Sequence, residues 1–125
     1  MQEHPNATLV RQMQSSMDNG DWAALENLVA DDIVWHEIGR AEPRRGKAEM
    51  GPPPGEGESD YDIKYEMHDV VADDDHTVVL GTATATRNGK TLVYRTAEIF
   101  HIRDGKITER WAFSDDTQRI VDFFA

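Results

Sequence analysis

Apolar residues in the first third of the chain recur every three or four positions, the spacing of an amphipathic helix. The first such stripe comprises Leu9, Val10, Met13 and Met17. Asn6 is a suitable N-cap for this helix, and Gly20 is a suitable residue to end it. A second stripe, which Asp21 can cap, comprises Trp22, Leu25, Leu28 and Val29. The pattern therefore predicts two helices, followed by a short strand around residues 33–38.

From Tyr61 onward, apolar and polar residues alternate with a period of two, as they do in half-buried strands. Turn signals divide this region at DDDH (73–76), at Asn-Gly (88–89) and at Asp-Gly (104–105). We therefore expect four long antiparallel strands in a meander. The last residues, DDTQRIVDFFA, return to a helical pattern and predict a short C-terminal helix.

Residues 51–60, GPPPGEGESD, separate the helical part of the chain from the long strands. Such a density of proline and glycine excludes a helix or a central strand and predicts a loop, either a lid over a pocket or merely a connection. Helices segregated from an antiparallel sheet predict a single α+β domain over residues 1–125. Because long strands twist and coil, the sheet should form a cone covered by the N-terminal helices, and its concave side is the default ligand pocket.

The charge balance narrows the choice of partners. The chain has 24 Asp and Glu residues against 13 Lys and Arg, for a formal net charge of −11. Such a surface repels nucleic acids and anionic membranes, so we expect neither as a partner. The chain has no cysteine, its first residues lack a signal-peptide pattern, and no apolar stretch approaches the length of a membrane span. We therefore expect a cytoplasmic protein.

No metal or cofactor is expected either. The five histidines, at positions 4, 36, 68, 76 and 101, show neither His-x-His nor His-Glu-x-x-His spacing. The glycines of residues 51–60 lie among prolines without a following helix, so they do not form a phosphate-binding loop. His36 and His68 are more simply explained as packed or surface imidazoles.

Strand alternation groups the candidate site residues by face. In the short strand it places Trp35 and Glu37 on one side and His36 on the other. In the third long strand it groups Tyr94, Thr96, Glu98 and Phe100. In the last strand it groups Trp111, Phe113 and Asp115. If the three sets face the concavity, they form an aromatic-walled pocket with up to three carboxyl groups, which can divide into a base and a neutral acid.

Each carboxyl group also has a purely structural explanation. Glu37 can be a paired carboxylate at the end of its strand. Glu98 can be an ordinary strand charge, either exposed or paired with a neighbouring strand. Asp115 and Asp116 can cap the final helix, because Asp is favourable at a helix N-terminus. Trp111 is a core or pocket-wall residue in either case.

Several stretches together resemble the NTF2-like superfamily, in its SnoaL-like and ketosteroid-isomerase-like branch. They are NGDWAALENLVADDIVWHEIG, EPRRGKAE, AEIFHIRDGKITERWAFSDD and the final short helix, and they span nearly the whole chain. The resemblance implies the cone fold. It also implies a homodimer formed through the outer face of the curved sheet. It does not by itself imply one activity, because this fold serves several enzymes and non-catalytic proteins.

The resemblance assigns roles to particular residues. In ketosteroid isomerases, Glu37 corresponds to the catalytic base and Glu98 to a protonated carboxylic acid, while Met13 stands where their oxyanion-hole tyrosine would be. In SnoaL-type cyclases, Asp115 or Asp116 corresponds to the acid/base. Epoxide-hydrolase relatives carry an arginine where this chain has Thr96, which argues against their chemistry.

Three functions remain as hypotheses. The first is a cofactor-independent acid–base enzyme, of isomerase or cyclase type, that acts on a small hydrophobic carbonyl compound. The second is a non-catalytic protein that binds such a small molecule in the same pocket. The third is a dimerising accessory or partner-binding domain. Carboxyl groups buried in the cavity favour the first, and a cavity filled by side chains favours the third.

Overall fold

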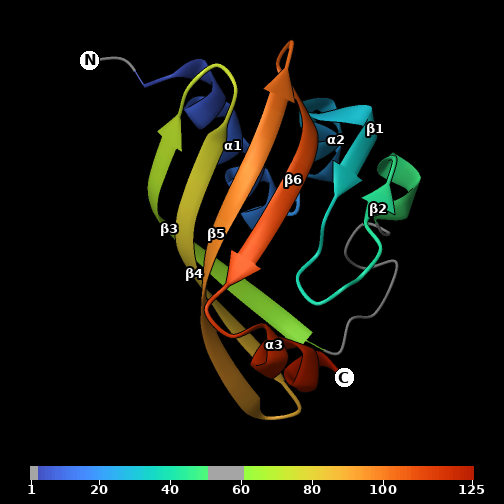
Figure 1. The fold of residues 1–125 in the computed structure, drawn as a ribbon, viewed down its shortest axis with the longest axis vertical. Helices are drawn as coiled ribbons and strands as arrows, with labels where there is room; N and C mark the ends of the chain where they lie inside the picture. Colours follow the sequence, from blue (N-terminus) through green and yellow to red (C-terminus); the bar gives the residue numbers. More distant parts are fainter. Residues whose placement is uncertain (1–2, 51–60) are drawn as a thin grey trace.

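The computed structural model describes residues 3–50 and 61–125, and its elements follow the predicted order (Figure 1). The helices are α1 (Pro5–Asp18), α2 (Trp22–Leu28) and α3 (Thr117–Phe124), with a short 3₁₀ helix at Lys47–Met50. The strands are β1 (Val29–Trp35), β2 (Arg44–Arg45), β3 (Tyr61–Ala72), β4 (Thr77–Arg87), β5 (Lys90–Arg103) and β6 (Lys106–Ser114). The short strand β2 and the 3₁₀ helix had no clear signal in the sequence. The predicted loop at 51–60 lies outside the described residues.

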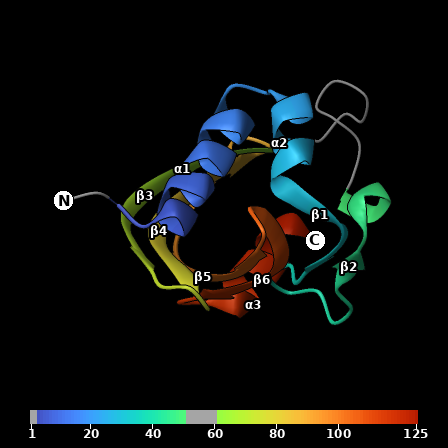
Figure 2. The ribbon, with the colours of Figure 1, turned by 90° about the horizontal axis from the view of Figure 1, so that it is seen from above.

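All six strands form one sheet in the order β2-β1-β6-β5-β4-β3. Neighbouring strands are antiparallel except β1 and β6, which are parallel. Seen from above, the sheet curves around, and α1 and α2 lie across its concave side (Figure 2). This arrangement confirms the predicted α+β cone with N-terminal helices.

Local capping explains where the first two helices begin. The N-cap of α1 is His4, whose ring accepts a hydrogen bond from the backbone N–H of Asn6. The predicted N-cap at Asn6 is therefore wrong by two residues, because Pro5 already occupies the first helical position, where its missing N–H costs nothing. Asp21 caps α2 as predicted, since its carboxylate accepts from the N–H of Ala24.

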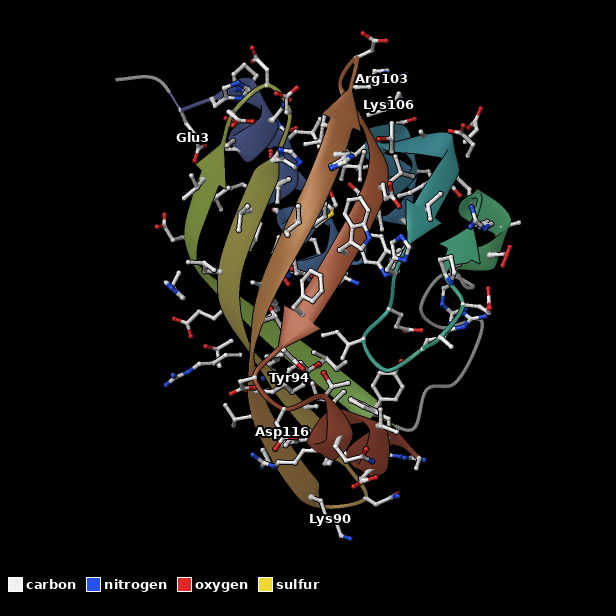
Figure 3. All side chains as sticks on the ribbon, in the orientation of Figure 1. Glu3, Lys90, Tyr94, Arg103, Lys106 and Asp116 are labelled. Carbon is white, nitrogen blue, oxygen red and sulfur yellow. The ribbon has the colours of Figure 1, made fainter. Side chains whose placement is uncertain are left out.

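Both predicted hairpin turns are present. Asn88 and Gly89 have φ values of 53° and 77°, and Asp104 and Gly105 have values of 53° and 74°. Two consecutive residues with positive φ match the right-handed twist of the flanking strands, which explains the Asn-Gly and Asp-Gly sequences. The turn tips lie at opposite ends of the sheet, with Lys90 near one and Arg103 and Lys106 near the other (Figure 3).

Two apolar clusters lie on the concave side. The larger one packs α1 against the sheet and comprises Leu9, Val10, Met13, Val29, Ile33, Val79, Phe100 and Ile107. The smaller one lies at the end where α3 packs and comprises Ala83, Ala85, Leu92, Tyr94 and Ile120 (Figure 1). No helix within residues 3–50 and 61–125 is both long and apolar enough to cross a membrane.

Candidate functional site

Between the two apolar clusters, the inner face of the sheet carries a charged residue. Glu98 on β5 lies opposite Val79 on β4 and Ala112 on β6. Residues that face each other across antiparallel strands share one side of the sheet, and Val79 is fully buried in the core. Glu98 therefore points inward, and only 8% of it is exposed.

Arg110 of β6 neutralises this carboxylate. Its Nε donates to Oε1 of Glu98 at 3.0 Å, and its Nη2 donates to the same oxygen. Its third nitrogen, Nη1, donates to the backbone carbonyl of His36 at 3.0 Å. The guanidinium carbon lies 4.2 Å from the centre of the Trp35 ring, a cation–π contact. A buried ion pair is stabilised when further hydrogen bonds engage its donors, and here each of the three guanidinium nitrogens has a partner.

Two phenols lie near Glu98. The hydroxyl of Tyr65, on β3, is 2.7 Å from the hydroxyl of Thr96 on β5. Burial raises the pKa of Tyr65 to about 12, and the negative charge of Glu98 adds to the shift. The same two causes, in the same order, raise the pKa of Tyr94, which lies beside α3 (Figure 3). Both phenols are thus neutral at physiological pH and available as hydrogen-bond donors.

The predicted inward-facing residues of β5 lie as a group on the concave side. Tyr94, Thr96 and Glu98 are all at most 9% exposed, and Trp35 of β1 reaches the same region through Arg110. Met13 and Phe100, which were expected to line a pocket, are buried in the larger apolar cluster. These two residues therefore contribute to the core between α1 and the sheet.

Trp111 and Phe113 do not face the concavity. Trp111 lies opposite Ile99, and Phe113 lies opposite Ala97, and both partners alternate with the inward residues of β5. Phe113 is 56% exposed. Trp111 and Phe113 do share one face, as grouped, but the expectation that this face is the concave one is wrong. A bulge between the pairs His101–Glu109 and Ile102–Ile107 puts Arg110 on the inner face, so its neighbour Trp111 points outward.

Glu37 and Asp115 do not join Glu98. Strand β1 ends at Trp35, so the alternation that grouped Glu37 with that residue does not extend to it. The carboxylate of Glu37 is 45% exposed and pairs with Arg44 at 3.1 Å. Asp115 is exposed and accepts a hydrogen bond from the backbone N–H of Arg95 at 3.2 Å.

The capping explanation holds for the neighbouring aspartate. Asp116 is the N-cap of α3, and its carboxylate accepts from the backbone N–H of Arg119 at 3.1 Å. In Figure 3, Asp116 lies at the start of α3. Its side chain therefore has a structural role at the helix N-terminus.

His36 connects the inner site to the outer face. Its ring stacks on Trp111 with centroids 5.3 Å apart, and its Nε2 is 2.7 Å from a carboxylate oxygen of Glu109. Its backbone carbonyl, by contrast, accepts from Arg110. The expectation that His36 and Trp35 face opposite sides is therefore confirmed.

Sequence reasoning missed Arg110 and Tyr65. Tyr65 belonged to the period-two pattern of β3, but nothing marked its hydroxyl as a neighbour of Thr96. Arg110 lies between Glu109 and Trp111 in β6, and its strand contains other polar residues, so the sequence did not mark it as buried. Within the described part of the chain, no group of three or more ligating side chains is suited to a metal ion.

Comparisons with known proteins agree with this architecture. Bal32a, from a soil-derived mobile gene cassette, has a TM-score of 0.82 at 25% identity, with 97% of both chains covered. An NTF2-like protein from Burkholderia xenovorans LB400 has a TM-score of 0.82 at 24% identity, with 100% of this chain and 99% of that chain covered. An LEH-like epoxide hydrolase from M. tuberculosis has a TM-score of 0.78 at 16% identity, with 96% and 89% covered.

No curated protein matches the chain. A family model described as a SnoaL-like domain, however, matches residues 10–110. That match covers most of the chain and includes α2, the β1 strand and the long sheet strands that carry Glu98 and Arg110. The chain therefore belongs to the SnoaL-like domain family, with the NTF2-like fold.

Proposed function

We propose that this protein binds a small, largely apolar carbonyl compound inside the cone and transfers a proton on it without a cofactor. The observation that carries the proposal is the buried carboxylate of Glu98, held by Arg110, with the neutral phenol of Tyr65 beside it and that of Tyr94 further along the same face. A fixed carboxylate beside neutral hydrogen-bond donors is the arrangement that proton abstraction next to a carbonyl group requires.

The roles follow from the chemistry of each group. Glu98 removes a proton from the carbon next to the carbonyl, and later returns it to the substrate. A phenol donates a hydrogen bond to the carbonyl oxygen while negative charge develops there. Arg110 orients Glu98, because two of its nitrogens bind the same carboxylate oxygen. Trp35 and Tyr94 supply apolar surface against which a hydrophobic substrate can pack.

The proposal assigns proton transfer to Glu98 and not to Glu37. The resemblance pairs these two residues as acid and base, but Glu37 lies exposed in an ion pair with Arg44. A solvated, exposed carboxylate is not oriented toward a bound substrate, whereas a buried, fixed carboxylate is preorganised.

Hydrogen exchange on a panel of cyclic ketones and enones tests the assignment. We expect Glu98→Gln to lower the exchange rate on the order of 10²-fold or more, because the amide keeps the shape and loses the basicity. Glu109→Gln is the matched control, since Glu109 lies on β6 and its carboxylate pairs with His36. Glu37→Gln should have little effect. If Glu37→Gln lost activity and Glu98→Gln kept it, the catalytic base would be Glu37 and the assignment to Glu98 would be wrong.

A second candidate is binding of the same class of compound without catalysis. The observation that favours it is that one oxygen of Glu98 already accepts two hydrogen bonds from Arg110, while neither Glu37 nor Asp115 lies beside it as a second acid or base. Ligand binding measured by titration calorimetry, with no hydrogen exchange above the rate of the Glu98→Gln variant, would establish this function in place of the first.

We also propose that the protein works as a homodimer through the outer face of the sheet. Val78, Ile99 and Trp111 form one apolar row on this face, and Leu80, Ala97 and Phe113 form the next. A third row on the same face runs from Glu66 through Thr82 to Arg95 and ends in opposite charges. A second copy is the partner that fits, because a two-fold axis can place Arg95 of each copy opposite Glu66 of the other.

Sedimentation velocity tests the dimer. Phe113→Glu should give a monomer, since it places a charge in the apolar rows. Met17→Glu, which alters an exposed apolar residue on α1, should leave the dimer intact. A dimer that survives Phe113→Glu would exclude this surface.

A further inference from the structure

Gly81 occupies a position on β4 where the backbone does not require glycine. Its inward neighbours along the strand, Val79 and Ala83, are buried residues with side chains. Gly81 is not among the glycines with positive φ. The reason for a glycine at this position must therefore be sought in the residues that pack over it.

The space above Gly81 is filled by the ring of Tyr65. A Cβ atom added to Gly81 would clash with Cε2, Cζ and the hydroxyl oxygen of that ring, far inside van der Waals contact. The backbone of Tyr65 is paired with Ala83, so its ring leans diagonally across β4. Its hydroxyl thereby reaches Thr96 on the next strand, at 2.7 Å.

The hydroxyl of Tyr65 on β3 thus reaches a site on β5, two strands away. Thr96 is two residues before Glu98 on β5, so both side chains point to the concave side. The proximity of the hydroxyl to the carboxylate is also the second cause of the raised Tyr65 pKa. With any larger residue at position 81, the ring would have to leave the surface of β4.

We propose that Gly81 is a positioning residue, and that the Tyr65 hydroxyl it admits to the site is the hydrogen-bond donor to the substrate oxygen. The second half of this inference rests on the function proposed above. In the unliganded protein the hydroxyl is engaged with Thr96, and in the complex it turns to the substrate oxygen. No bond to oxygen is broken, because the phenol donates a hydrogen bond and keeps its proton.

Spectrophotometric titration of the tyrosines tests the first half without any substrate. The chain has three tyrosines, and the component that Tyr65→Phe removes belongs to Tyr65. In the unmodified protein this component should titrate near pH 12. In Gly81→Ala it should move toward pH 10, the value of an exposed phenol. Thr82→Ala, on the opposite face of β4, should leave it unchanged. Tyr94, whose pKa is also raised, contributes to every variant, so the Tyr65 component in Gly81→Ala is the difference between Gly81→Ala and Gly81→Ala/Tyr65→Phe. If this difference still titrates near pH 12, the positioning role is overturned.

A double variant keeps the test decisive if Gly81→Ala alone does not fold. Removing the ring removes the clash, so Gly81→Ala in a Tyr65→Ala background should be at least as stable as Tyr65→Ala itself. This comparison isolates the contact between the two residues, as a double-mutant cycle does. If Gly81→Ala destabilises the protein equally in both backgrounds, the steric argument is wrong.

The hydrogen-exchange assay tests the second half. Tyr65→Phe and Gly81→Ala should each lower kcat by about 10²-fold, the effect of losing one oxyanion donor, with a small change in KM. If Glu98→Gln abolishes exchange while Tyr65→Phe exchanges at the normal rate, Tyr65 is not the donor and the proposed function stands. If the unmodified protein gives no exchange, the proposed function and the donor role both fail, and the titration alone decides the positioning role.

Discussion

Replacing Arg110 with methionine should be among the most damaging single changes on the concave side of the sheet. The substitution keeps a long, apolar side chain against Trp35 and removes the guanidinium. Glu98 would then be a buried carboxylate without its partner, since both side chains are only 11% exposed. The carbonyl of His36 would also lose the donor that now lies at 3.0 Å.

The magnitude follows from these lost contacts. Removing one partner of a buried ion pair costs about 3–5 kcal/mol, because the remaining charge is left uncompensated. The cation–π contact with Trp35 contributes about 0.5–2 kcal/mol on its own, but it is not additive with the pair. We therefore expect the free energy of unfolding to fall by about 3–5 kcal/mol.

Urea denaturation followed by tryptophan fluorescence measures this change, and two further variants make it interpretable. Glu98→Leu combined with Arg110→Met removes both charges, and should recover most of the loss, since an apolar replacement of a buried pair is often neutral. Arg44→Met breaks the exposed pair with Glu37 and should cost at most about 1 kcal/mol.

Two outcomes would refute the reasoning. If Arg110→Met lowered the free energy of unfolding by less than about 1 kcal/mol, the Glu98–Arg110 pair would contribute no more than an ordinary surface ion pair. A double variant whose loss equals the sum of the two single losses would show that Glu98 and Arg110 are not energetically coupled.

Three further predictions concern single residues. The folded-state pKa of Tyr65, about 12, exceeds the value of an exposed phenol, so its stabilising contribution is complete below pH 10 and is lost between pH 10 and 12. Over this pH range, the melting temperature should therefore fall less in Tyr65→Phe than in the unmodified protein. Asp21→Ala should lower the free energy of unfolding by about 1 kcal/mol through loss of the α2 cap, and Asp32→Ala, an exposed acid, should not. Thr77→Val should raise it by about 1 kcal/mol in urea melts, because the buried Thr77 hydroxyl has no hydrogen-bond partner among the described residues.

The elements most reliably predicted from the sequence were those set by local chemistry. Asn88–Gly89 and Asp104–Gly105 specified their turns because few other dipeptides accept two positive φ values. Asp21 specified the start of α2 in the same way, because its carboxylate accepts a hydrogen bond from the backbone N–H of Ala24, three residues further along the chain. Signals of this kind act within a few residues, so they can be read without knowledge of the tertiary fold.

Strand faces were predicted less well, because alternation identifies residues that share a face and does not tolerate an inserted residue. Ile107 and Arg110 both point inward although they are three residues apart. The register shows why: Ile102 pairs with Ile107, and His101 pairs with Glu109, so one residue of β6 is extra. The outer face is also apolar there, so hydrophobicity did not reveal the error.

The partner of Glu98 illustrates what a sequence can supply once the register is known. A charge on the inner face of a sheet must find its counter-charge within reach, on the facing residue or on a diagonal one. The facing residues, Val79 and Ala112, are apolar. The next inward position of β6 is Arg110, opposite Phe100, and it lies on the diagonal from Glu98. The same diagonal logic leads from Tyr65 over Gly81 to Thr96, so in this sheet the polar site is specified by diagonal neighbours, which a strand considered alone does not contain.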